Sequence, residues 1–172
     1  ALKFMDKAHG DDKPFFVWFN ATRMHVWTRL SPEWDGKSGY GLYADGLMEH
    51  DHHVGLLLDK LDELGIADDT IVIYSTDNGS QTNTYPDGGM EPFRGEKGST
   101  WEGGFRVPAL IRWPGVVEPG RVINDRFSHL DWLPTLMTAA GEPGIAGKLR
   151  QGHRAGGKSY RVYLDGYDQT ER

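Results

Sequence analysis

The sequence contains no cysteine and no long hydrophobic run. Without cysteine, the 172 residues form no disulfide, no thiolate metal site and no cysteine nucleophile. Hydrophobic runs stay well below the ~20 residues of a membrane-spanning helix, and the amino end has no secretory hydrophobic segment. Basic residues are outnumbered, with 19 Lys and Arg against 25 Asp and Glu, which argues against nucleic acid as a partner.

Large apolar side chains and glycine are abundant. Hydrophobic residues make up 38% of the chain and include six Trp, seven Tyr and seven Phe, too many for a disordered chain. The 23 glycines and nine prolines indicate many turns and close-approach loops. We therefore expect a folded chain of about one domain in size.

The order of sequence patterns predicts an α/β fold. Residues 15–19 form a continuous aromatic and β-branched run, typical of a strand covered on both faces, which favours a parallel sheet. Apolar residues recur every three or four positions over 43–64, which predicts an amphipathic helix ended by Gly65. The remaining predicted elements are a helix over 1–10, strands over 70–76 and 107–113, a helix capped by Ser128 and ended by Gly141, and an exposed strand over 160–164.

Asp77, Asn78 and Gly79 directly follow the predicted strand over 70–76. Ligands of open α/β sheets bind at the carboxyl ends of the strands, where the loops converge. An Asp and an Asn offer the oxygen ligands that suit Ca²⁺, and less well Mg²⁺. Ca²⁺ takes about six to eight ligands, so two are an incomplete site. Asn-Gly is also a common turn sequence, which leaves a purely structural role open.

A glycine-rich loop over 92–106 is the second candidate site. It belongs to a stretch without periodicity over 79–106, longer than the about 12–15 residues of an ordinary structureless connection. Lys97 lies between Gly95 and Gly98, so its ammonium group can approach an anion. Arg94 and Arg106 can bind an anion bidentately, or they can pair with Glu96 and Glu102 as scaffold. We expect the Trp and Phe side chains of the loop to anchor it by burial.

Histidines form the third set of candidates. His25 follows the predicted strand over 15–19, a position that suits a general acid acting on a leaving group, although a structural imidazole fits the spacing equally well. His50, His52 and His53 cluster with Asp51 on the predicted helix, and His52 and His53 cannot both share a face with His50. We expect this cluster to be mostly surface and capping residues, with a zinc site as the less favoured alternative.

In their order and spacing, these blocks resemble the arylsulfatases of the alkaline phosphatase superfamily, most closely the bacterial type. The blocks are Thr-Asp-Asn-Gly at 76–79, the run at 93–108 and Arg-Trp-Pro-Gly at 112–115, extended by Pro-Phe-Phe at 14–16, the run at 131–136 and Leu-Asp-Gly-Tyr at 164–167. The resemblance implies an alkaline phosphatase-like fold, a mostly parallel sheet sandwiched by helices, incomplete at the amino-terminal side. Residues 1–143 would be the carboxyl-terminal part of the catalytic domain, and 144–172 a tail in which a small subdomain begins.

The resemblance also implies roles for the candidate residues in hydrolysis of a small-molecule or carbohydrate sulfate ester. Asp77 and Asn78 correspond to calcium ligands, Lys97 to the lysine that contacts a sulfate oxygen, and His25 to the histidine that protonates the departing alcohol. Arg94 is a further candidate for substrate binding. The family also implies a periplasmic or secreted location.

One family feature has no counterpart in this chain. The sulfatase nucleophile is a formylglycine made from the first residue of a Cys/Ser-x-Pro-x-Arg motif, which does not occur here. The family's Asp-Asp pair and a further Lys and His are also unmatched, and the chain does not begin with Met. We expect these groups upstream and no turnover by this segment alone. The alternatives are a phosphate or phosphonate monoester hydrolase of the same superfamily, or a non-catalytic sulfatase-like fragment.

Overall fold

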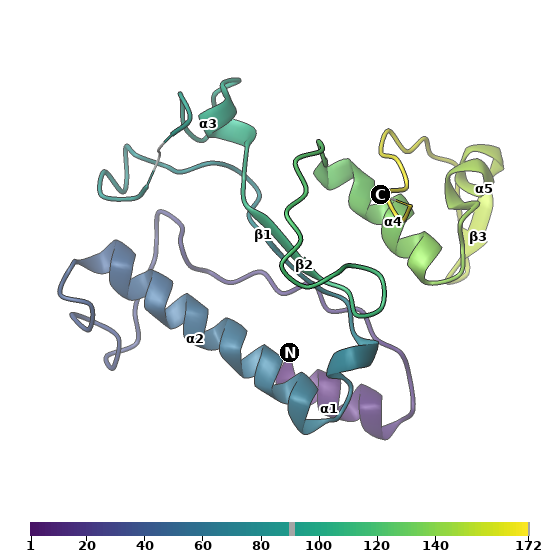
Figure 1. Ribbon diagram of the computed structural model, residues 1–172, viewed down its shortest axis with the longest axis horizontal. Helices are drawn as coiled ribbons and strands as arrows, with labels where there is room; N and C mark the ends of the chain where they lie inside the picture. The colour runs from purple at the N-terminus through teal and green to yellow at the C-terminus, as the bar shows by residue number, and fades with distance from the viewer. Residues whose placement is uncertain (90–91, 172) are drawn as a thin grey trace. The chain divides into compact units, whose positions relative to one another are not determined.

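The computed structural model describes residues 1–89 and 92–171. Its backbone contacts group the chain into two compact units, Ala1–Arg121 and Val122–Arg172 (Figure 1). The first unit holds the candidate site residues. Its elements are α1 (Leu2–Gly10), α2 (Leu42–Glu63), the 3-10 helix η1 (Ala67–Asp69), β1 (Val72–Ser75), α3 (Glu102–Phe105) and β2 (Ala109–Arg112).

The two predicted helices of this unit are confirmed. Helix α1 buries Met5 and Ala8 and ends before Pro14, as expected. Helix α2 covers the predicted range and buries Leu61 from its apolar stripe. Near its start, however, the buried residues are Asp45, Gly46 and Glu49, whereas Leu47 of the stripe is exposed. Polar contacts rather than apolar burial therefore hold the first half of α2.

Strands β1 and β2 confirm the predicted strands over 70–76 and 107–113 in shortened form. They pair antiparallel, with Val72 opposite Arg112 and Ser75 opposite Ala109, so the parallel pairing expected for the sheet is not found between these two strands. The Ser75 hydroxyl also donates a hydrogen bond to the Pro108 carbonyl at 2.8 Å. Figure 1 shows that the described residues of the connection between the two strands, 76–89 and 92–108, carry α3 beyond the strand ends. The loop with Lys97 is part of this connection.

The predicted strand over 15–19 is wrong for the part of the chain that the structure describes. These residues have no secondary structure assigned, and the side chains of Phe16 and Trp18 are exposed. A strand is stable only when a neighbour satisfies its backbone N–H and C=O groups. Residues 15–19 join neither of the two ladders in the described residues, so their apolar character alone does not make them a strand.

The second unit contains η2 (His129–Asp131), α4 (Trp132–Ala139), α5 (Ile145–Gln151), β3 (His153–Ala155) and β4 (Lys158–Tyr160). The predicted cap at Ser128 is confirmed as a capping box, because the Ser128 hydroxyl accepts from the Leu130 N–H and the Asp131 carboxylate accepts from the Ser128 N–H. The predicted strand over 160–164 is wrong beyond Tyr160, where β4 ends. The predicted division at residues 143 and 144 stays a prediction.

No helix in the described ranges is long and apolar enough to cross a membrane.

Candidate functional site

Asp77 and Asn78 lie immediately after β1, at its carboxyl end. The Asp77 side chain is exposed, and its carboxylate accepts a long hydrogen bond of 3.4 Å from the Thr76 hydroxyl. The Asn78 amide nitrogen donates to the Gly79 carbonyl at 2.8 Å, so the amide oxygen is the atom turned away from this backbone contact. Two consecutive residues with oxygen ligands of the kind that hard cations prefer therefore follow the end of the strand.

The loop with Lys97 packs directly against the residues that follow Asn78. The Gly79 N–H donates to the Gly104 carbonyl at 2.9 Å, and the Lys97 N–H donates to the Ser80 carbonyl at 2.8 Å. A methyl group at Gly79 would lie 1.7 Å from the Gly103 carbonyl oxygen, so only glycine permits this contact. The structure thus joins the backbone of Lys97 to the segment directly after Asp77 and Asn78.

Glu96 adds a side-chain link between the same two segments. Its carboxylate accepts hydrogen bonds from the N–H of Thr82, at 2.9 Å, and from the Thr82 hydroxyl. These hydrogen bonds hold the pKa of the Glu96 carboxyl below its ordinary value, so the group stays ionised. The residue before Lys97 is therefore hydrogen-bonded to Thr82 through its side chain, and Lys97 itself is hydrogen-bonded to Ser80 through its backbone.

The scaffold alternative is wrong for Arg94, which pairs with neither Glu96 nor Glu102. Its guanidinium lies 4.1 Å from the centre of the Trp101 ring. For Arg106 the scaffold alternative is confirmed, because its guanidinium pairs with Glu102 at 3.6 Å. The expectation of buried aromatic anchors is wrong, because Trp101 is 52% and Phe105 61% exposed. Close backbone contacts at glycines hold the loop instead of buried aromatic side chains.

His25 lies in a tight turn with an exposed side chain. Thr28, which is only 2% exposed, donates from its N–H to the His25 carbonyl at 2.8 Å, and its hydroxyl accepts from the His25 N–H at 3.0 Å. The Tyr85 hydroxyl donates to the same carbonyl at 2.6 Å. Tyr85 follows Ser80 and Thr82 along the chain, so one segment contacts both the His25 turn and the Lys97 loop.

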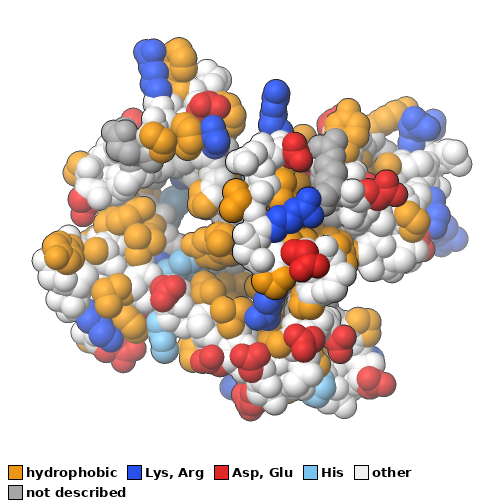
Figure 2. Space-filling model, in the orientation of Figure 1, with side chains coloured by type: hydrophobic (Ala, Val, Ile, Leu, Met, Phe, Trp, Pro, Cys, Tyr) orange, Lys and Arg blue, Asp and Glu red, His pale blue; other side chains and the backbone are white. Residues whose placement is uncertain are grey.

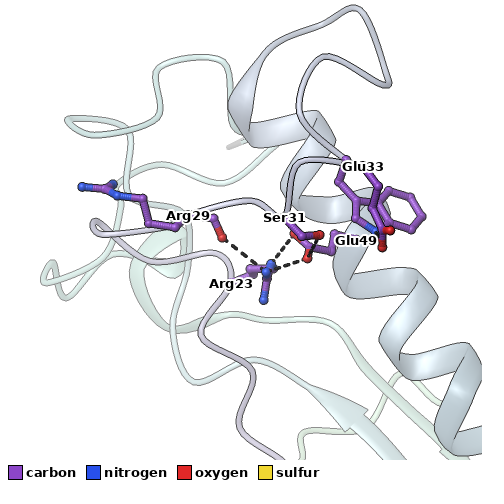
Figure 3. Close-up of polar contacts among 6 residues, drawn as sticks. Arg23, Arg29, Ser31, Glu33 and Glu49 are labelled. Atoms are coloured by element: carbon purple, nitrogen blue, oxygen red, sulfur yellow. Dashed lines mark hydrogen bonds and ion pairs between the residues drawn. The ribbon is translucent and has the colours of Figure 1, made fainter.

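A buried ion pair fixes the segment that holds His25 to α2 (Figure 3). The Arg23 guanidinium donates two hydrogen bonds to the Glu49 carboxylate, at 2.6 and 2.7 Å, and the Ser31 hydroxyl donates a third at 2.8 Å. Burial by itself would raise the pKa of Glu49, but the hydrogen bonds from Ser31 and Arg23 hold that pKa below its ordinary value. Glu49 is therefore a carboxylate within the fold.

Asp45, one turn before Glu49, fixes the loop that precedes α2 in the same way. Its carboxylate accepts from the N–H groups of Gly36 and Ser38, at 2.8 and 2.7 Å. Hydrogen bonding from Ser38 and Gly36 holds the pKa of Asp45 below its ordinary value. Sequence reasoning missed Asp45 and Glu49, although two carboxylates at i and i+4 repel each other on a helix unless other groups bind them.

In the histidine cluster on α2, Asp51 and His52 are exposed as expected, and His50 is the residue that departs from the expectation. His50 is half-buried, and its ring centre lies 5.8 Å from that of Tyr74 in β1. The His50 Nδ1 atom is buried without a hydrogen-bond partner within the described part of the chain, and burial lowers the pKa of the imidazole. His52 stacks near Trp34 at 5.3 Å. Within residues 1–89 and 92–171, no three His, Asp or Glu side chains are grouped to hold a metal ion.

The donor atoms at residues 77 and 78 fit part of a calcium site. An exposed carboxylate and an amide oxygen are hard ligands, and they stand at a strand end where other segments can converge. They supply two of the about six to eight ligands that Ca²⁺ takes. A cation held here would need further ligands besides these two side chains.

The comparisons with known proteins place the chain in one family. Residues 1–142 match the family model described as Sulfatase. The chain is 40% identical over 144 residues to human arylsulfatase A, a match that spans 83% of this chain and 28% of that protein. The chain belongs to the sulfatase family, and it spans about a quarter to a third of the length of the relatives that it matches.

Two solved structures support the fold. The PsFucS1 sulfatase from Pseudoalteromonas sp. matches with a TM-score of 0.85 and 31% identity, over 98% of this chain and 32% of that chain. Ps i-CgsB in complex with k-i-k-neocarrahexaose matches with a TM-score of 0.73 and 31% identity, over 82% of this chain and 32% of that chain. The predicted family and α/β fold class are confirmed, with a partial sheet.

The structure brings some of the predicted site residues together. Asp77, Asn78 and Lys97 lie on backbone segments that hydrogen-bond to each other, and His25 is linked to the same stretch through Tyr85. That the side chains meet on one ligand stays a prediction, as do their individual roles. Sequence reasoning missed Thr28 and Tyr85, because no motif indicates a side chain that acts on another residue's backbone.

Proposed function

We propose that this chain contributes the calcium-binding, sulfate-binding and proton-donating residues of a sulfuric ester hydrolase. The observation that supports it is the direct packing of the Lys97 loop against the residues after Asp77 and Asn78. This packing ties the backbone of Lys97 to the segment that follows Asp77 and Asn78, which supports a shared site where a cation and an ammonium group bind one sulfate group. Family membership supplies the reaction class.

In the proposed reaction, Lys97 binds a sulfate oxygen through its ammonium group and stabilises the charge that develops there. Asp77 and Asn78 hold Ca²⁺. When bound, the cation supplies further positive charge to the sulfate group, and a formylglycine from outside this chain supplies the oxygen nucleophile.

His25 acts at the other end of the bond that breaks. As the bond from sulfur to the ester oxygen breaks, its electron pair passes to that oxygen, and the imidazolium of His25 gives its proton there. The alcohol leaves neutral, and His25 is left as a neutral imidazole. Arg94, exposed above Trp101, is a further candidate contact for the substrate.

We include carbohydrate sulfate esters in the substrate class. The support is the similar structure Ps i-CgsB, which is in complex with k-i-k-neocarrahexaose. Small aryl sulfates remain in the class because arylsulfatase A is among the relatives.

The decisive experiment is Lys97→Ala in the full-length enzyme that contains this chain. We expect kcat/KM for an aryl sulfate to fall at least about tenfold, since removing one donor to a developing oxyanion costs about 10²–10³ in other enzymes. Lys7→Ala is the matched control, because Lys7 is an exposed lysine of α1 that pairs with Asp11. Unchanged kinetics for Lys97→Ala would refute its assignment.

The same assay separates the alternative functions. Para-nitrophenyl sulfate and para-nitrophenyl phosphate present the same leaving group, so their kcat/KM ratio reports the preference for sulfur or phosphorus. A clear preference for the phosphate ester would support a phosphomonoester hydrolase instead. Turnover of neither ester, in a well-folded full-length protein loaded with Ca²⁺, would support a non-catalytic member.

A further inference from the structure

We propose that Thr28 and Tyr85 are positioning residues for His25, which fix the backbone of its turn so that the exposed imidazole is aimed at the leaving oxygen. The inference rests on the proposed function, in which His25 is the proton donor. It goes further by assigning two residues that act only through His25.

Thr28 occupies both backbone polar groups of His25. The Thr28 hydroxyl accepts from the His25 N–H at 3.0 Å and donates to the His25 carbonyl at 2.7 Å, and the Thr28 N–H donates to that carbonyl at 2.8 Å. Thr28 is almost fully enclosed, so water competes little for these bonds. A single side chain therefore closes the turn on both sides of the His25 Cα atom.

Tyr85 restrains the same turn from a distant part of the chain. Its hydroxyl donates to the His25 carbonyl at 2.6 Å, and the residue is only 7% exposed. Its ring centre lies 5.4 Å from that of Tyr43 in α2, which limits movement of the phenol. The His25 carbonyl thus receives three donors, from Thr28 N–H, Thr28 Oγ1 and Tyr85 Oη, which concentrates the restraint on one peptide group.

Further contacts fix the two flanks of the turn. Arg23 lies two residues before His25 and is bound to Glu49, and Ser31 binds the same carboxylate after the turn (Figure 3). The backbone is held on every side, whereas the imidazole itself is exposed. This combination suits a general acid, because proton transfer depends on placing the donor within hydrogen-bond reach of the leaving oxygen.

The test compares leaving groups, because a proton donor matters most when the leaving oxygen is basic. In the full-length enzyme, Tyr85→Phe and Thr28→Val each remove one hydroxyl with little change of shape. We measure kcat/KM for phenyl sulfate, whose leaving group is basic, and for para-nitrophenyl sulfate, whose leaving group departs readily without a proton. We expect both variants to lose about tenfold on phenyl sulfate and less than about twofold on para-nitrophenyl sulfate.

Two matched controls separate positioning from general damage. Thr28→Ser keeps the hydroxyl and should restore most of the activity on phenyl sulfate. Tyr43→Phe makes the same change as Tyr85→Phe in the neighbouring ring and should leave both rates close to wild type. Melting temperatures of all variants identify any protein that has lost its fold. If Tyr85→Phe has, the comparison of Thr28→Val with Thr28→Ser decides the test.

Each outcome decides the inference. Equal losses on both substrates, or no loss, in Tyr85→Phe and Thr28→Val would overturn it while leaving the role of His25 intact. His25→Ala is the reference variant: if it shows no dependence on the leaving group, the proposed proton donor is wrong and the positioning role fails with it. A matching pattern in His25→Ala and the two positioning variants supports both.

Discussion

Among single residues, Glu49 shows how a charge becomes part of the interior. It is 2% exposed, and its carboxylate is held by Arg23 and Ser31 rather than by solvent. An isolated buried carboxylate would take up a proton, because burial penalises the charged form. Here hydrogen bonds outweigh that penalty, and the pKa of Glu49 is lowered. The stabilisation that the ion pair gives to the fold therefore depends on pH.

We predict that Glu49→Gln lowers the free energy of unfolding by about 3 kcal/mol at pH 7, because Arg23 loses its buried partner. The lowered pKa in the folded state means that Glu49 stabilises the fold above the ordinary pKa of 4.5, and that this contribution is lost as pH falls through the lowered value. Urea unfolding of wild type and Glu49→Gln from pH 7 to pH 3 should therefore show that their difference in free energy of unfolding shrinks below about pH 4.5.

Glu63→Gln is the control for this prediction. Glu63 also pairs with a cation, Lys60 at 2.6 Å, but its side chain is 66% exposed. Surface ion pairs contribute about 0–1 kcal/mol, so we expect little change. A Glu49→Gln protein as stable as wild type across the whole pH range would show that the pair with Arg23 does not stabilise the fold.

The candidate site could be predicted only where its residues lie in local motifs. Asp77 and Asn78 could be found because they follow a β-branched run, and Lys97 because glycines flank it. The Glu96 link to Thr82 and the Tyr85 link to His25 join residues that are separated in the chain, and each includes a backbone group, the Thr82 N–H or the His25 carbonyl. Such contacts leave no periodic signal in the sequence, so only the folded structure reveals them.

Within elements, two glycines of α2 have opposite roles. A methyl group at Gly46 would lie 2.5 Å from the sulfur of Met24, so the absent side chain makes room for the segment that holds His25. Gly55 has open space around its Cα atom. Glycine costs a helix interior about 0.5–1 kcal/mol relative to alanine unless packing requires it. Packing requires it at Gly46 only.

We predict that Gly55→Ala raises the free energy of unfolding by about 0.5–1 kcal/mol, through the better helix propensity of alanine. Gly46→Ala should lower it by about 1–3 kcal/mol, because the Met24 side chain and its segment must move. Thermal and urea unfolding of the two variants check this, each serving as the other's control. The same sign for both substitutions would contradict the steric explanation.

The elements also show which parts of the fold a sequence can predict. Helices α1 and α2 and the capping box at Ser128 follow from patterns within one segment, and all three are confirmed. Strands depend on partners elsewhere. Residues 15–19 have a strong strand composition and no place in a ladder of the described residues, whereas the less hydrophobic Val72–Ser75 pairs with β2.

Over the whole molecule, large apolar side chains reach the surface in unusual number. Hydrophobic side chains come to the surface at many points of the face shown in Figure 2. Phe16, Trp18 and Trp27 are each more than 70% exposed. Exposed apolar surface and unpaired backbone in residues 15–19 favour association with other chains.

We therefore predict that the isolated 172-residue chain associates and is poorly soluble. Size-exclusion chromatography with light scattering should show species larger than a monomer over a range of protein concentrations. Replacing Phe16 and Trp18 by serine should reduce association without changing helix content by circular dichroism. A soluble monomer with a single cooperative melting transition would contradict the prediction.

The contact between Gly79 and Gly104 also bears on chemical ageing. Asn-Gly sequences deamidate when the glycine nitrogen attacks the asparagine side chain, and asparagine is a heat-sensitive residue for this reason. In the folded chain the Gly79 N–H is bonded to Gly104, and the Asn78 amide is bonded to the Gly79 carbonyl. Both partners of that attack are held in place, so folding preserves Asn78 as an amide. Heat-stressed protein should therefore lose its asparagine at position 78 in proportion to the fraction of molecules in which this loop is open.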